Sequence, residues 1–111
     1  MQKDNVGLLR ISEDVVIKIA ASAINEIKGV EAIKSDRGIL KKLFTRDDPI
    51  RIRIFGDVIE LSVDVVVKYG YKVISVCEKI QQAVKSSVQE TTGITVSKVN
   101  IIVSGISFEK K

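Results

Sequence analysis

The chain has 111 residues and a formal net charge of +4, and it is 45% hydrophobic and 29% charged. Such a composition is typical of one globular domain and excludes a disordered chain. Its single cysteine excludes an internal disulfide, and the absence of histidine excludes Ser-His and Cys-His nucleophiles and imidazole metal ligands. Because these catalytic groups are missing, we expect a protein that is not an enzyme. No apolar run is long enough to span a membrane and no signal-peptide pattern opens the chain, so we expect a cytoplasmic protein.

The first predicted elements are a short strand over residues 6–11 and a helix that follows it. Ser12 is a good N-cap, and Glu13 and Asp14 place negative charge in the first helical turn, where the helix dipole favours it. Lys28 and Gly29 supply a cationic last turn and a glycine stop. Between these ends, one face of the predicted helix carries apolar residues at spacings of three and four: Val16, Ala20, Ala23, Ile24 and Ile27.

Val30 to Lys34 predicts a second strand, and residues 35–49 predict a long loop that contains the only proline. Seven basic residues lie between Lys34 and Arg53 against three acidic ones, and this excess equals the net charge of the whole chain. An acidic partner would therefore be attracted to this part of the chain. The basic residues are Lys34, Arg37, Lys41, Lys42, Arg46, Arg51 and Arg53.

Four apolar residues at helical spacing interrupt this basic loop: Ile39, Leu40, Leu43 and Phe44. They are either a lid that packs over the open end of the core or anchors for a partner. The lid is the favoured interpretation, because a stretch this apolar is rarely left in water. If the segment binds a partner instead, Leu43 and Phe44 are the anchors that we expect.

A β-hairpin is predicted next, with strands over residues 50–55 and 58–69 that alternate apolar and polar residues. Gly56-Asp57 between them is a two-residue turn of the type with glycine first. The alternation makes one face of the sheet apolar and the other charged. The pairs expected on the charged face are Arg53 with Glu60, Arg51 with Ser62 and, diagonally, Arg51 with Asp64.

Ser75 and Glu78 predict a capping box for a second helix, which Gly93 ends. A last strand is predicted over residues 94–103, and its phase slips in a way that indicates a bulge near Ser97-Lys98. The apolar stripe expected on the helix is Cys77, Ile80, Val84 and Val88.

These elements predict an α+β fold in which residues 1–111 form a single domain, in the order β-α-β-β-β-α-β. Because only one face of the sheet needs cover, we expect a two-layer sandwich with both helices on one face of a mostly antiparallel sheet. The strand over residues 58–69 and the terminal strand are also candidates for edge-to-edge pairing, so self-association is a further expectation.

Individual residues offer little catalytic chemistry. Cys77 lies on an apolar helical stripe, which favours a buried hydrophobic side chain over a reactive thiol. Glu60 and Asp64 share a sheet face with two arginines, which favours cross-strand ion pairs over an acid–base pair. No two glycines lie three residues apart, so the GxxG loop of KH domains is missing, as are the dinucleotide-binding and P-loop fingerprints. We therefore expect no catalytic, cofactor or metal site.

The basic segment has several interpretations. A cluster of basic residues like this one most often belongs to a solvent-exposed loop that binds no partner. The functional alternatives are a docking site for an acidic protein or for an anionic membrane surface, and a nucleic-acid site. Arg51, Arg53 and Phe55, expected together on one exposed sheet face, are the nearest feature to a platform that stacks bases and holds phosphates.

Several segments, taken together and in order over nearly the whole chain, resemble one family. They are GLLRIS at residues 7–12, the helix from residues 15–30, VDVVVKYG at residues 63–70, and QAV, TGITV and VNI between residues 82 and 101. The basic loop before the hairpin is also similar. The sequence thus resembles the alkaline-shock-protein family of Gram-positive bacteria, also called the Gls-type envelope stress response proteins.

The resemblance implies a non-enzymatic protein of cell-envelope stress or envelope and lipid homeostasis, without a cofactor, that acts by binding other proteins. Some relatives are held at the membrane by a separate anchor protein, so a membrane-anchored protein partner is expected. The chain would bind through the basic loop and the charged hairpin face, and nucleic-acid binding by the same basic segment is the alternative. The partner-binding residues that we expect are Lys34, Arg37, Lys41, Lys42, Leu43, Phe44, Arg46, Arg51 and Arg53.

Overall fold

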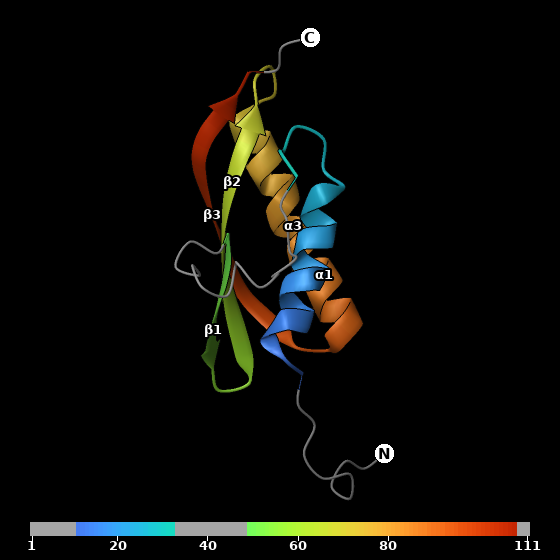
Figure 1. Ribbon diagram of the computed structural model, residues 1–111. Helices are drawn as coiled ribbons and strands as arrows, with labels where there is room; N and C mark the ends of the chain where they lie inside the picture. Colours follow the sequence, from blue (N-terminus) through green and yellow to red (C-terminus); the bar gives the residue numbers. More distant parts are fainter. Residues whose placement is uncertain (1–10, 33–48, 109–111) are drawn as a thin grey trace, which may run out of the picture.

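Residues 11–32 and 49–108 are described by the structure, a computed structural model of the chain (Figure 1). The predicted strand over residues 6–11 and the predicted loop over residues 35–49 therefore lie outside the described residues, apart from Ile11 and Pro49. The described elements, in chain order, are helix α1 (Glu13–Asn25), strands β1 (Ile50–Phe55) and β2 (Val58–Lys68), helix α3 (Val73–Thr92) and strand β3 (Thr95–Ser107).

Helix α1 begins where the sequence predicts. The Ser12 hydroxyl accepts a hydrogen bond from the Val15 N–H at 3.3 Å, which satisfies one of the free amides of the first turn. The helix ends at Asn25, and Gly29 takes a backbone conformation with a φ of +97° that L residues rarely adopt. The buried residues of the helix are Val16, Ile17, Ala20, Ala21, Ala23 and Ile24.

The sheet has the strand order β1-β2-β3 and is mixed. Strand β1 pairs antiparallel with β2, and the predicted partners Arg53–Glu60 and Arg51–Ser62 are confirmed. Strand β3 pairs parallel with β2. The predicted α+β fold with two helices is confirmed, and the three described strands form a mixed sheet in which β1–β2 is antiparallel and β2–β3 is parallel, where the sequence predicts mostly antiparallel pairing. The reason is that α3 carries the chain back along the sheet, and such a crossover makes the next strand parallel.

The predicted strand from Val30 to Lys34 is, in its described part, a single bridge between Val30 and Val67. The Glu31 N–H donates to the Val66 carbonyl at 2.9 Å, and the Lys68 N–H donates to the Gly29 carbonyl at 2.8 Å. This short stretch pairs with the far end of β2, on the edge that β1 occupies elsewhere.

The predicted capping box of the second helix is wrong. Helix α3 begins at Val73, its N-cap is Lys72, and no side chain caps it. The chain turns through Gly70, with a φ of +100°, and enters the helix early enough for Val73 to pack against the core. Ser75 and Glu78 therefore lie inside the first turns, where a capping box cannot form. Val76 takes the place predicted for Cys77, and the buried stripe is Val76, Ile80, Val84 and Val88.

Strand β3 contains the predicted bulge and a second one. Ile59 pairs with Val96 but Glu60 pairs with Lys98, which leaves Ser97 as the extra residue. The second shift leaves Ser104 extra, and the strand continues to Ser107 instead of ending at Val103. The hydroxyls of Ser97 and Ser104 donate to β2 carbonyls at 3.1 and 3.3 Å, so the side chains replace backbone donors lost at the bulges.

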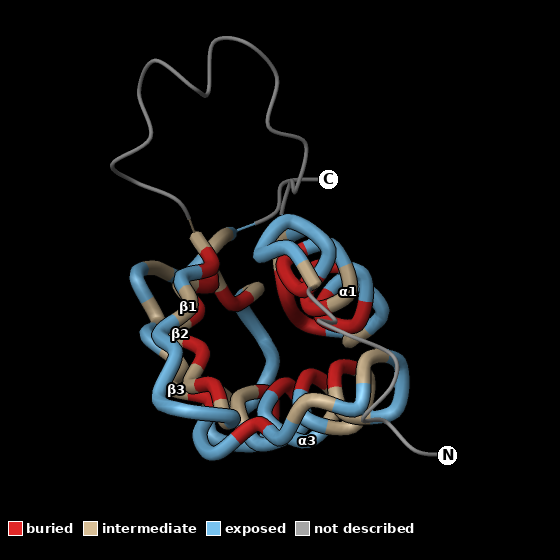
Figure 2. Tube along the Cα trace, turned by 90° about the horizontal axis from the view of Figure 1, so that it is seen from below, coloured by how far each residue is buried: buried red, intermediate tan, exposed pale blue. Residues whose placement is uncertain are grey.

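Both helices pack on one face of the sheet, and the buried residues lie between the two layers (Figure 2). The odd-numbered residues of β2, from Ile59 to Val67, form the floor of this core and are all buried. The even-numbered residues point to the opposite face, which no described element covers. That face is the only side of the described sheet whose side chains are open to a partner along all three strands.

Ile80 and Ile74 test the core, because they are the same residue type on the same helix. Ile80 has no exposed surface, whereas Ile74 is 74% exposed. We expect Ile80→Ala to lower the free energy of unfolding by about 2–5 kcal/mol, because it removes buried methyl groups and leaves a cavity. Ile74→Ala should change it by less than about 0.5 kcal/mol. Urea denaturation followed by circular dichroism measures both, and equal effects would contradict the layer assignment.

Gly29 lies in the turn that follows α1 and Gly70 in the turn between β2 and α3, and the two glycines form a matched comparison. Both have a φ near +100°, but a Cβ at Gly29 would lie 2.8 Å from the Tyr71 ring, whereas a Cβ at Gly70 would meet nothing within 4 Å. We expect Gly70→Ala to cost the backbone strain of about 1–3 kcal/mol. Gly29→Ala should cost about 1–3 kcal/mol more, the usual effect of overpacking.

Thermal unfolding of the Gly29→Ala and Gly70→Ala variants measures the two losses of stability. The extra cost of Gly29→Ala should shrink when Tyr71→Ala is combined with it, since the ring that blocks the Cβ is then absent. An extra cost that persists in the double variant would show that the Tyr71 ring is not its source.

Candidate functional site: the open face of the sheet

The uncovered side of the sheet, here called the open sheet face, is built from rows of residues that run across the three strands. Arg53, Glu60 and Lys98 form one row, because Glu60 pairs with both of the others. The next row places Ser62 between Arg51 and Asn100. The residues that define the face are Arg51, Arg53, Phe55, Glu60, Ser62, Asp64, Lys98 and Asn100.

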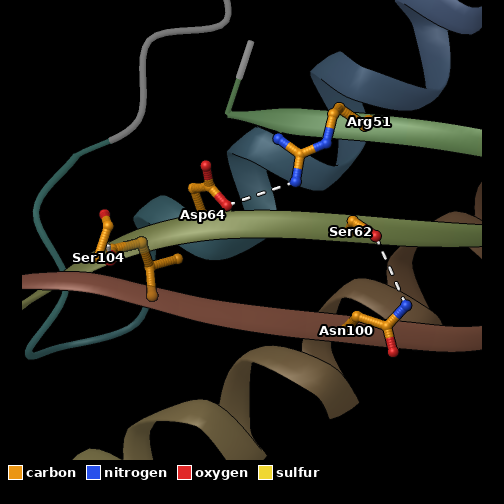
Figure 3. A network of polar contacts seen from close by, with 6 residues as sticks. Arg51, Ser62, Asp64, Asn100 and Ser104 are labelled. Carbon is orange, nitrogen blue, oxygen red and sulfur yellow. Dashed lines mark hydrogen bonds and ion pairs between the residues drawn. The ribbon is translucent and has the colours of Figure 1, made fainter. Parts of the chain in front are cut away.

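An amide and an ion pair join the strands on this face (Figure 3). The Asn100 amide donates to the Glu60 carboxylate at 2.7 Å and lies 3.5 Å from the Ser62 hydroxyl. The Arg51 guanidinium lies 3.5 Å from the Asp64 carboxylate, as the diagonal pairing predicts. Since these two side chains are 45% and 38% exposed, the ion pair contributes only about 0–1 kcal/mol to stability. These contacts orient the polar groups of the face more than they stabilise the fold.

Arg53 is placed differently from Arg51. Its guanidinium carbon lies 5.2 Å from the centre of the Phe55 ring, within the range of a cation–π contact. Its neighbour across the strands, Glu60, is hydrogen-bonded to Asn100 on the other side. Phe55 is 47% exposed, so the hairpin end of the face presents a cation and an aromatic ring together.

The carboxylates of the open sheet face do not form a catalytic pair with each other. Glu60 is bonded to Asn100 and Asp64 faces Arg51, so each has its partner on a different neighbouring strand. Within residues 11–32 and 49–108, no three His, Cys, Asp or Glu side chains gather in a way that could hold a metal ion. The described residues of this face therefore show hydrogen-bonded and ion-paired side chains on three strands.

Two hollows lie away from this face. One, of about 250 Å³, is lined mainly by apolar residues between the start of α1 and the tip of the hairpin, among them Ile11, Ile52 and Ile94. The other, of about 380 Å³, lies between α1 and α3 and includes Lys18 and Glu26. The acidic residues that line them are Glu13 and Asp57 in the first hollow and Glu26 in the second.

The structure places two of the nine predicted partner-binding residues. Arg51 and Arg53 lie two residues apart on β1 and on the same face, as expected. The other seven, Lys34, Arg37, Lys41, Lys42, Leu43, Phe44 and Arg46, lie outside the described residues. The sequence interpretation missed Lys98 and Asn100, which β3 adds to the face. The bulge at Ser97 was the signal that could have found them, because it decides which side of β3 they occupy.

Comparison with known proteins identifies the chain. The model of the alkaline-shock-protein family, described as having a "cell envelope-related function", matches residues 1–108. The chain belongs to this family. The resemblance that its short motifs indicate is thereby confirmed.

The alignments with three related proteins span most of this chain and most of each relative. The protein YloU of Bacillus subtilis (strain 168) is 30% identical over 108 residues, which is 90% of this chain and 88% of the relative. Spy1614 of Streptococcus pyogenes serotype M6 is 29% identical over 106 residues, with the same two shares. YqhY of Bacillus subtilis is 22% identical over 111 residues, 96% of this chain and 82% of the relative.

Solved structures share the fold. The copper form of MamM CTD D249H superposes with a TM-score of 0.53 at 15% identity, over 85% of this chain and 98% of that chain. The nickel form of MamM CTD E289H gives a TM-score of 0.52 at 15% identity, over 83% of this chain and 96% of that chain. At this identity the similarity concerns architecture, and the metals belong to those proteins. None of the described helices here combines the length and the hydropathy needed to cross a membrane.

Cys77 provides a test of the chemistry available to this chain. Burial raises the pKa of its thiol above the ordinary value, and the side chain is only half-buried on α3. Since the thiolate is the reactive species, less of it forms at a given pH in the folded protein. We expect the alkylation rate by iodoacetamide to rise at a higher pH in the folded chain than in the same chain unfolded in urea.

Mass spectrometry across a pH series measures this rate without ambiguity, because the chain has one cysteine. A folded-state titration midpoint below that of the unfolded chain would indicate an activated thiol and would contradict the expectation that Cys77 is unreactive.

Proposed function

We propose that the protein is a non-enzymatic interaction module of the cell envelope stress response or of envelope and lipid homeostasis. It binds a protein partner through the open sheet face together with the basic segment that precedes β1. The partner is envelope-associated, so the protein works next to the membrane while being held there by another molecule. Membership of a family with cell envelope-related function supports the setting.

The observation that carries the proposal is the contrast between the two faces of the sheet. One face buries an apolar layer under two helices, and the other, polar face lies open along all three described strands. Hydrogen bonds and an ion pair already orient Glu60, Asp64 and Asn100 on it, so a partner would meet fixed groups rather than mobile ones. Fixed groups lose little conformational entropy on binding.

The charge of the face indicates the chemistry of the partner. Arg51 is balanced by Asp64, and Glu60 is engaged by the neutral Asn100. The row across the strands still holds two cations, Arg53 and Lys98, on either side of the single Glu60. With the basic residues between Lys34 and Arg46 next to it in sequence, the surface favours an acidic protein surface. Arginine and aromatic side chains are the commonest energetic centres of such interfaces, so Arg53 and Phe55 are the anchors that we propose.

Charge reversal at Arg53 tests the proposal. Arg53→Glu should weaken capture of the partner at least about tenfold, which corresponds to about 1.4 kcal/mol, because it sets like charges against each other at the interface. Lys79→Glu is the matched control, since Lys79 is an exposed residue of α3 in the helical layer. The measurement is affinity purification of the tagged chain from its native cells, with quantitative mass spectrometry of the co-eluting proteins.

Two additions make the result decisive. A Lys41→Glu, Lys42→Glu variant should reduce capture of the same protein while leaving the melting temperature nearly unchanged, because those lysines belong to the proposed basic segment. Nuclease treatment before elution distinguishes the alternative, in which the same charges hold nucleic acid. Capture that is unaffected by Arg53→Glu, or that depends entirely on nucleic acid, would overturn the proposal.

A further inference from the structure

Strand β3 forms one edge of the described sheet, with β2 as its neighbour. In a ladder, the peptide groups of alternate residues point to the neighbouring strand and the others point away. Helix α3 shows which residues of β3 point away. The Gln89 side chain accepts from the Val96 N–H at 2.9 Å, and the Gln81 side chain donates to the Val99 carbonyl at 3.0 Å. Both peptide groups therefore lie on the outer edge.

From Val99 to Val103 the register with β2 has no shift, so inward and outward peptide groups continue to alternate. The peptide groups of Ile101 and Val103 therefore also face outwards. Asp64 and Val66, on the opposite pleat of β2, bond to the β1 side, which agrees with this assignment. No residue in the described part of the chain pairs with these outward groups of Ile101 and Val103. Side chains of α3 thus provide hydrogen-bond partners for the outward backbone groups of Val96 and Val99, whereas those of Ile101 and Val103 have none among the described residues.

The side chains of this stretch are apolar and uncharged. Ile101 and Val103 are half-buried at the rim of the core, and Ile102 is 45% exposed on the open sheet face. No charged residue occurs from Val99 to Ser107, although 29% of the chain is charged. Natural edge strands are usually protected from pairing by lysine, proline or bulges. Here the bulges lie at Ser97 and Ser104 and leave a regular stretch between them.

We propose that this stretch pairs antiparallel with β3 of a second copy of the chain, about a twofold axis at Ile102. In this register Ile101 of each copy lies opposite Val103 of the other, and the two residues exchange both backbone hydrogen bonds. Ile102 lies against Ile102 of the second copy, without hydrogen bonds between them. The three described strands of each copy become one continuous sheet of six.

The uncharged edge and the distribution of charge over the chain suit a second copy as the occupant. An antiparallel register about Ile102 brings no lysine of β3 opposite its own equivalent, because Lys98 faces the region of Ile106. The basic residues Arg51 and Arg53 lie on β1, at the opposite edge of the sheet. With strands about 4.8 Å apart, the two β1 strands would be about 24 Å from each other, well beyond the screening length of about 10 Å at 0.1 M salt. Two positively charged copies can therefore meet at β3.

Of the paired residues, only Ile102 has its side chain on the open sheet face, and the paired backbone groups of Ile101 and Val103 lie on the outer edge of β3, so the dimer does not require the proposed partner complex. Its test is sedimentation velocity of the purified chain with two charge-introducing variants. The wild type should sediment as a dimer, Ile102→Lys as a monomer, and Ile74→Lys as a dimer. Ile74 is the matched control, because it is an exposed isoleucine on α3 rather than at the edge. Far-UV circular dichroism verifies that each variant is folded.

A cross-link tests the register without disrupting the pairing. In a Cys77→Ser background, Ile102→Cys should form a disulfide-linked dimer on mild oxidation, since non-bonded antiparallel partners have Cα atoms about 4.5 Å apart, within disulfide range. Ile54→Cys, an exposed position on β1, should remain uncross-linked. A wild type that stays monomeric, a dimer that survives Ile102→Lys, or equal cross-linking at both positions would each overturn the proposal.

Discussion

The burial of β2 is the constraint on which the rest of this structure depends. Leu61, Val63 and Val67 have no exposed surface, and the strand is bonded along both edges. A central strand that is covered on one face only must turn its alternate residues outwards. The same residue-by-residue alternation therefore creates the apolar layer under the helices and the polar face that we propose as the binding surface. Changing the register of β2 by one residue would exchange the two faces.

Much of this arrangement follows from local sequence. The two-residue turn at Gly56-Asp57 fixes the pairing of the hairpin, and with it the positions of Arg51 and Arg53 on one face. The helical stripe and the glycine stop of α3 are equally local signals. Local sequence patterns do not show whether two neighbouring strands run in the same or in opposite directions. Whether β3 runs parallel or antiparallel to β2 depends on how α3 packs over the sheet, which involves residues distant in sequence.

The features that the sequence predicted wrongly or missed have related causes. The capping box at Ser75 and Glu78 fits a known pattern, but packing of Val73 against the core starts the helix earlier without any side-chain cap. The hydrogen-bonding of Glu60 to Asn100 depends on β3 docking beside β2, so the sequence could suggest the face but not its third strand. The family assignment, by contrast, needs no geometry, because it depends on the order of several short motifs.

The parallel crossover also bears on how the molecule assembles. The hairpin closes across two residues, whereas Ser97 meets Ile59 over a separation of 38 residues. Closing the longer loop costs more chain entropy, and contacts of large sequence separation slow folding. The hairpin should thus form early and β3 should dock late. Until it docks, one whole edge of β2 is unpaired, and during that interval this central strand is the part of the chain most exposed to misassociation.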